Sequence, residues 1–154
     1  MSDKIDPNQL PQSAEALRMS ILQKEMERMD QDRKVHEAEE KKRADFAHDF
    51  LSKHVSEDEI AMVRRLIGIA VRDGKFEAMV YSFPSVLCTD GGRAINSNDP
   101  RWPTTLQGKA LEFFERYEQL AKPQGYRLKA MVINFPGGIP GDIGLFLNWA
   151  PAEA

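Results

Sequence analysis

The side chains best suited to chemistry in this sequence gather in two loops of its C-terminal hundred residues. Each loop follows a Phe-Pro dipeptide, at residues 83–84 and at residues 135–136. The candidate ligand-binding residues are Cys88, Thr89, Asp90, Arg93 and Asn96 in the first loop and Asp142 in the second. Because an arginine beside glycine N–H groups suits a carboxylate or phosphate, a small anion is the ligand that this pattern favours.

The same residues do not complete a catalytic site. Cys88 would need a neighbouring base to act as a nucleophile, and the three histidines all lie earlier, between residues 36 and 54. Asp90 and Asp142 could share acid–base work only if burial separated their pKa values. The glycines follow no nucleotide-binding spacing. We therefore predict no catalytic residue, no cofactor and no metal site, and we interpret Cys88 as a small buried apolar residue.

Two strand segments lead into these loops, and they repeat each other. Residues 75–84 and 127–136 share Ala-Met-Val-x-x-Phe-Pro at an offset of 52. Amphipathic helices are predicted before them, over residues 56–72, where Ser56-Glu-Asp-Glu59 forms a capping box, and over residues 104–120. The sequence thus indicates a helix–strand unit used twice.

A last strand is predicted over residues 143–149, with Ile143, Leu145, Leu147 and Trp149 on one face. The link over residues 136–142 is short enough for an antiparallel hairpin. The helix between the first two strands predicts that they are parallel, which would bring both Phe-Pro corners to one sheet edge. The prediction is an α+β (α/β-like) fold: a long charged helix, then a small αβαββ domain with a three-stranded mixed sheet.

The charged helix is predicted over residues 13–51, which contain no glycine or proline. Residues 24–43 carry 14 charged side chains, seven of each sign. Pairs such as Asp30 with Lys34 therefore stabilise the helix itself and do not pack it against another element. A continuous helix would be about 58 Å long. A domain of a hundred residues has a radius of gyration of only about 13 Å, so the helix cannot pack along its whole length.

The apolar residues of this helix are the candidate interaction residues: Leu17, Ile21, Leu22, Met26 and Met29. They favour an arm that oligomerises or docks a partner. The alternative is a solvated helix that folds back over its own domain. Arg33 and Glu40 interrupt the heptad pattern, so a long regular coiled coil is not predicted.

Composition narrows the class of protein. We predict a disordered tail over residues 1–12, a helical arm over 13–54 and a compact domain over 55–154. The net charge is −3, and acidic residues interleave the basic ones, so we do not expect a nucleic-acid partner. No apolar run reaches the roughly 20 residues that cross a bilayer, and we expect no signal peptide. A single cysteine favours the cytoplasm.

The sequence therefore favours a non-enzymatic cytoplasmic protein that self-associates as a homo-oligomer or docks a protein partner through its N-terminal helix. The alternative is a small-molecule domain, or a minor enzyme, that uses the loops after Phe83 and Phe135 to hold an anionic ligand.

Overall fold

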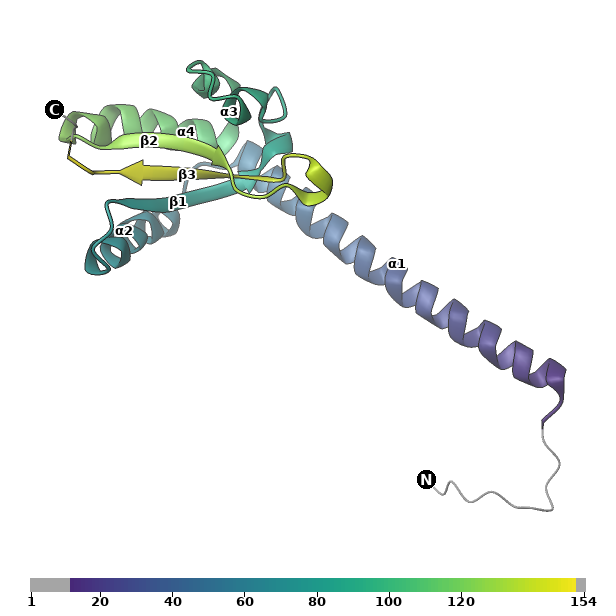
Figure 1. Ribbon diagram of the computed structural model, residues 1–154. Helices are drawn as coiled ribbons and strands as arrows, with labels where there is room; N and C mark the ends of the chain where they lie inside the picture. The colour runs from purple at the N-terminus through teal and green to yellow at the C-terminus, as the bar shows by residue number, and fades with distance from the viewer. Residues whose placement is uncertain (1–11, 152–154) are drawn as a thin grey trace. The chain divides into compact units, whose positions relative to one another are not determined.

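The N-terminal helix forms as predicted, as a single element. The computed structural model describes residues 12–151, and the chain divides into a unit that ends at Asp45 and a unit that begins at Phe46. Helix α1 (Ala14–Ser52) crosses this division without a break (Figure 1). Residues 1–11, most of the predicted disordered tail, lie outside the described residues. We use "arm" for residues 14–45 of α1 and "compact unit" for residues 46–151.

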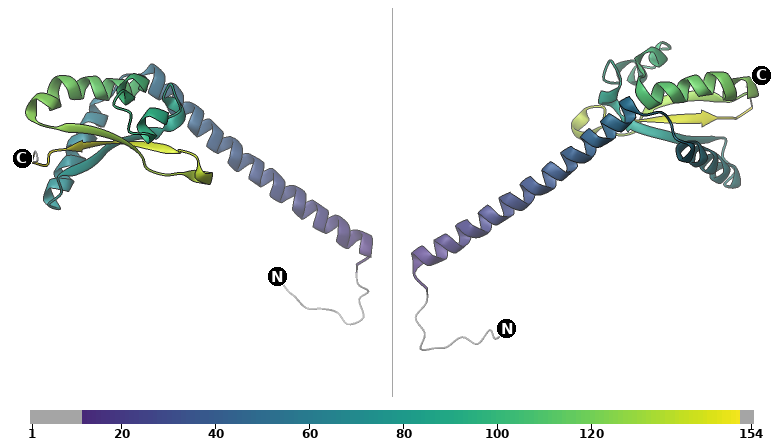
Figure 2. Two further views of the ribbon diagram at one scale, coloured as in Figure 1. Left: turned by 45° about the horizontal axis from the view of Figure 1, so that its top comes forward. Right: turned by 180° about the vertical axis from the view of Figure 1, so that it is seen from behind.

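The compact unit is of the α+β class, which confirms the predicted class. Its elements, shown in Figures 1 and 2, are α2 (Glu57–Arg72), β1 (Glu77–Pro84), α3 (Arg93–Asn96), α4 (Gly108–Arg116), β2 (Arg127–Val132) and β3 (Asp142–Asn148). The predicted capping box starts α2: the Glu59 N–H donates to Ser56 Oγ and the Ser56 N–H donates to Glu59 Oε1, each at 3.1 Å.

The sheet corrects one prediction. Its strand order is β1-β3-β2, and both neighbouring pairs are antiparallel, so the sheet is not mixed. Strands β1 and β2 do run in the same direction, but β3 lies between them. The physical reason is burial: Ile143 and Leu145 of β3 are 0% exposed, less than any residue of β1 or β2, and the central position of a sheet buries a strand best.

The second helix is shorter than predicted. Instead of residues 104–120, α4 spans nine residues, preceded by a 3-10 turn at Trp102–Thr105 and followed by a π-helical turn at Tyr117–Ala121. Gly108, whose φ is +60°, interrupts the right-handed backbone and prevents an earlier α-helical start. Gly125, at a φ of +95°, ends the segment.

The core lies between one face of the sheet and the helices. A bulge between Met79 and Tyr81 turns both Val80 and Tyr81 toward this core. Phe50, in the last turn of α1, packs against Phe83 with ring centroids 5.3 Å apart and is only 1% exposed. The compact core therefore takes in residues that the predicted division at residue 54 had placed in the arm.

The sequence repeat describes equivalent positions on either side of β3. Val80 and Val132 are both buried, and Met79 and Met131 are both exposed on the opposite sheet face. The equivalence ends at the corners, because Phe83 is 2% exposed and Phe135 is 51% exposed. The repeat thus encodes two edge strands, but only one of its two phenylalanines is a core residue.

Trp149 is a further correction. It lies just after β3, half-buried, with its ring centroid 6.3 Å from that of Tyr126, and its backbone N–H donates to the Phe76 carbonyl. It is therefore not buried with Ile143, Leu145 and Leu147, as the predicted shared face implied, because the strand ends at Asn148.

Candidate functional site

The arm is held helical by its own side chains. Ser13 Oγ accepts the Ala16 N–H at 3.1 Å, which satisfies one free donor at the start of α1. The predicted pair of Asp30 with Lys34 forms at 3.3 Å, and Arg33 bridges Asp30 and Glu37. These exposed pairs are screened by solvent and each contributes little, but together they favour the helix without requiring a second element.

Four apolar side chains form a narrow stripe along the arm. Met19, Leu22, Met26 and Met29 follow at spacings of three, four and three residues, which places them on one helix face. Each is between 53% and 63% exposed. We call these residues the seam. Three of them, with the small residue Ala16, line a shallow depression in the helix surface.

The five interaction residues predicted from sequence do not share one face. Leu22, Met26 and Met29 belong to the seam, whereas Leu17 and Ile21 lie about 160° and 120° away from its middle around the helix. Met19 was missed by the prediction, although its spacing of three from Leu22 and seven from Met26 identifies it. The arm thus carries one coherent apolar seam and two separate apolar residues.

The predicted loop residues come from two loops at one end of the sheet. The two loops meet where the Ser85 N–H donates to the Gly141 carbonyl at 2.8 Å. Cys88 is buried, and burial raises the pKa of its thiol to about 11. Asp142 is held in its own loop by Asn134: the Asp142 backbone N–H donates to Asn134 Oδ1 at 2.8 Å, and Asn134 Nδ2 donates to Asp142 Oδ2 at 3.0 Å.

Asp90 serves its own loop. Its carboxylate accepts the N–H groups of Gly92 and Ala94 at 2.9 and 2.8 Å, an arrangement that fixes the turn into α3. It therefore does not pair with Arg93. Thr89, Arg93 and Asn96 are exposed.

Three of the glycine N–H groups that could have held an anion are also occupied. Those of Gly91 and Gly138 donate to the carbonyls of Cys88 and Phe135 at 3.2 and 3.1 Å, and that of Gly92 donates to Asp90. The loop is thus internally bonded, and the anion site at these residues stays a prediction.

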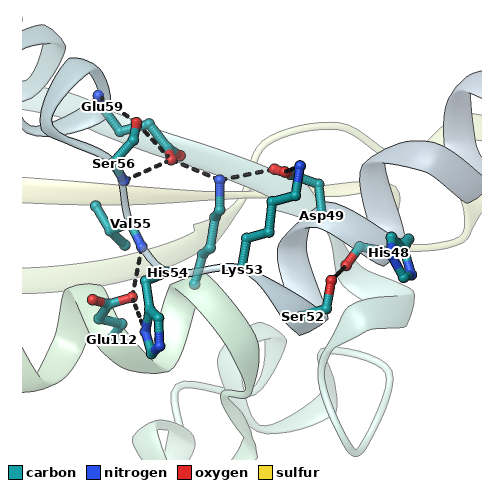
Figure 3. Close-up of polar contacts among 10 residues, drawn as sticks. His48, Asp49, Ser52, Lys53, His54, Val55, Ser56, Glu59 and Glu112 are labelled. Carbon is teal, nitrogen blue, oxygen red and sulfur yellow. Dashed lines mark hydrogen bonds and ion pairs between the residues drawn. The ribbon is translucent and has the colours of Figure 1, made fainter.

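A buried lysine joins three helices of the compact unit. Lys109 Nζ, at the start of α4, lies 2.8 Å from Asp49 of α1 and 2.6 Å from Glu59 of α2. Figure 3 labels these two carboxylates. Burial acts to lower the pKa of Lys109, but the two carboxylates outweigh it and raise that pKa above its ordinary value. Nearby, the Val55 N–H donates to Glu112 at 2.7 Å. This network fixes the chain between α1 and α2, and we interpret it as structural.

A groove opens between α2 and α4 over the covered face of the sheet, and sequence reasoning did not find it. Its volume is about 280 Å³. Ile60, Val63 and Ile67 line one side and Phe113 and Leu120 the other, with strand residues as the floor.

Two arginines stand at this groove. Arg64 and Arg116 line both the groove and an adjoining polar depression, and Arg116 lies 3.5 Å from Glu112. The sequence carries three arginines on the first amphipathic helix and one on the second, and arginine on an amphipathic helix is too common a feature to identify a site.

Among residues 12–151, no helix has the length and apolar character needed to span a membrane, and no three His, Cys, Asp or Glu side chains are grouped to hold a metal ion. Comparison with models of known protein families, with curated proteins and with solved structures gave no match. Function is therefore inferred from the chain's own surfaces.

Proposed function

We propose that this chain is a non-enzymatic protein that self-associates through its arm. The observation that carries the proposal is the exposure of the whole seam on a helix that is already formed. Burying one leucine or methionine side chain gains about 1.5 to 3 kcal/mol. A pre-formed helix also avoids most of the ordering cost that a disordered segment would meet on binding. We keep the cytoplasm as the proposed compartment, because a single cysteine allows no internal disulfide.

The proposal is tested by one matched pair of substitutions in the full chain. Leu22→Glu places a charge in the seam, whereas Leu17→Glu places the same charge on another face of the same helix. Light scattering across protein concentrations should show that Leu22→Glu loses self-association and Leu17→Glu keeps it. Equal masses for both variants and the unmodified chain at every concentration would contradict the proposal. Circular dichroism confirms that both variants keep their helix.

A second candidate function rests on the groove between α2 and α4. An apolar groove with two arginines at one end suits a ligand with an apolar tail and an anionic head. This keeps the anionic ligand predicted from sequence but places it away from the Phe-Pro loops.

Dodecanoate and dodecanol are matched probes for the groove, because they differ only in the charged head. Dodecanoate should raise the melting temperature of the unmodified chain, and the rise should shrink in Arg64→Met. No shift with dodecanoate, or equal shifts with both probes in both proteins, would remove this candidate.

A further inference from the structure

We infer that the arm's partner is a second copy of the same arm, running antiparallel, with residue 22 of one copy level with residue 26 of the other. The inference rests on the proposed self-association and specifies its geometry. In this register, a residue of one copy faces a residue of the other copy when their two residue numbers add up to 48. Residues 14–34 then overlap over about 32 Å.

The seam supplies the core of this pair. Met19 faces Met29 of the second copy, and Leu22 faces Met26, and the symmetry repeats both layers. Alternating spacings of three and four residues are those of positions a and d in a heptad, where such side chains interlock. Sliding the helices by one heptad in either direction leaves only two of the four layers wholly apolar. The seam itself therefore selects the register.

A charged residue lies one layer beyond the apolar seam at each end, and in this register the charged residues that face each other have opposite signs. One heptad step before Leu22 is Glu15, and one step after Met26 is Arg33. The antiparallel register sets Glu15 of each copy against Arg33 of the other. Arg33 is now engaged only in exposed pairs within its own helix, with side chains of Arg33 and Glu37 about 60% exposed, so it can contact a second copy at little cost.

The charged residues that flank the seam also favour the antiparallel orientation. In an antiparallel pair, residues at g positions face each other, which sets Arg18 near Asp32 of the second copy, twice. The symmetry also brings the two copies of Glu25 together. That contact is unfavourable, but each Glu25 carboxylate lies 2.9 Å from Arg28 of its own helix, which offsets part of the repulsion.

A parallel pair with the same seam meets repulsion throughout. Its end layers would set Glu15 against Glu15 and Arg33 against Arg33. Its flanking contacts join residues five apart, so Glu25 would face Asp30, and Asp32 would face Glu37, each twice. Like charges in these positions disfavour a pairing and determine orientation. The antiparallel form has four favourable charged contacts and one unfavourable one, and the parallel form has no favourable contact of this kind.

Disulfide mapping distinguishes the two orientations. We would mix full-length Leu22→Cys with full-length Met26→Cys under mild oxidation and identify the linked peptides by mass. For the antiparallel pair we expect mainly links between residue 22 and residue 26, which lie level with each other. A residue and its own copy are then about 6 Å apart along the helix axis, so links between identical positions are disfavoured. Cys88 can stay in place, since burial raises its pKa to about 11 and keeps the thiol protonated.

Each outcome decides something. Links of 22 to 22 and 26 to 26 would overturn the antiparallel inference and leave self-association through the seam intact. A chain that forms dimers but no seam link, or that stays monomeric, would overturn both.

A charge exchange sharpens the result. Arg33→Glu should weaken self-association about tenfold or more, because both end layers become like-charged. Adding Glu15→Arg to the same chain should restore the dissociation constant to within about fivefold of the unmodified value, with helix content checked by circular dichroism. A parallel pair would show no such rescue, because each end layer would still join identical charges.

Discussion

The two ends of α1 are parts of one helix, but apolar residues are exposed to solvent at one end and buried at the other. In the arm, the seam is more than half exposed, whereas Phe50, near the C-terminal end of the same helix, is fully buried. The backbone is the same in both parts. The difference is what faces each side chain: Tyr81 and Phe83 of β1 pack on Phe50, and within the arm no second element does so.

This contrast separates helix formation from apolar burial. Exposed ion pairs and the absence of glycine and proline are enough to make α1 continuous, and none of that depends on a core. An apolar stripe on such a helix is therefore free to serve another surface. In the compact unit the apolar residues stabilise the fold, and in the arm we propose that they stabilise an assembly.

The largest expected effect compares the two parts directly. Phe50→Ala should lower the free energy of unfolding of the compact unit by about 3 to 5 kcal/mol, because it leaves a cavity against three aromatic rings. Leu22→Ala should change the same quantity by less than about 0.5 kcal/mol. Denaturant unfolding followed by the fluorescence of Trp102 and Trp149 measures both at a concentration where the protein is monomeric. Equal losses would show that the arm is part of the same core.

Gly108→Ala should be the next most costly change. Its backbone has a φ of +60°, and an added Cβ would meet the carbonyl of Phe50. We expect a loss of about 2 to 3 kcal/mol. Gly125→Ala is the matched control, since φ there is +95° but no atom lies within 4 Å; it should cost about 1 kcal/mol. If both cost the same, close packing of α4 on α1 does not decide the position of Gly108.

Lys109→Met tests the polar link between α1 and the other helices. Removing the ammonium leaves two carboxylates without their shared partner, and we expect a loss of about 1 to 2 kcal/mol at neutral pH. The hydrogen bond from Lys109 lowers the pKa of Asp49 below 3.8. For Glu59, burial acts to raise the pKa, but bonds from Lys109 and Ser56 hold it below 4.5.

The pH dependence of this loss follows from those directions. The lowered pKa values mean that the carboxylates stabilise the fold above about pH 4.5, and that this stabilisation disappears as pH falls through their folded-state values. The raised pKa of Lys109 means that its contribution is present below pH 10.5 and is lost above it. Unfolding curves of both proteins should therefore differ most between these limits and converge in acid. A constant difference from pH 2 to pH 7 would assign the loss to packing instead.

How far the sequence predicted the molecule can be judged from particular residues. The capping box at Ser56 and the continuous α1 depend on neighbours along the chain, and both were predicted. The place of β3 could not be read locally, because it depends on which strand buries most apolar surface once all three meet. The ends of α4 were predicted wrongly for a similar reason, because Gly108 starts the helix only when Phe50 packs against it.

The candidate sites divide in the same way. Most of the seam could be found from spacing alone, because helical periodicity survives in an isolated helix. The role of Asp90 could not be predicted, because bonding to its own turn and bonding to Arg93 look identical in sequence. The groove also required three dimensions, since its walls come from helices almost fifty residues apart.

The smallest expected effect concerns Arg93. The side chain is exposed, and Asp90 is bonded to backbone N–H groups instead, so Arg93→Met should change the free energy of unfolding by less than about 0.5 kcal/mol. Thermal melts with and without inorganic phosphate should coincide for both proteins. A phosphate-induced rise in the unmodified chain that Arg93→Met abolishes would restore the anion site predicted from sequence.

Native mass spectrometry of the unmodified full-length chain tests the central claim most directly. Our account predicts a species at twice the chain mass of 17.5 kDa whose fraction grows with protein concentration, and its loss in Leu22→Glu but not in Leu17→Glu. A single species at 17.5 kDa at every concentration, for all three proteins, would contradict it.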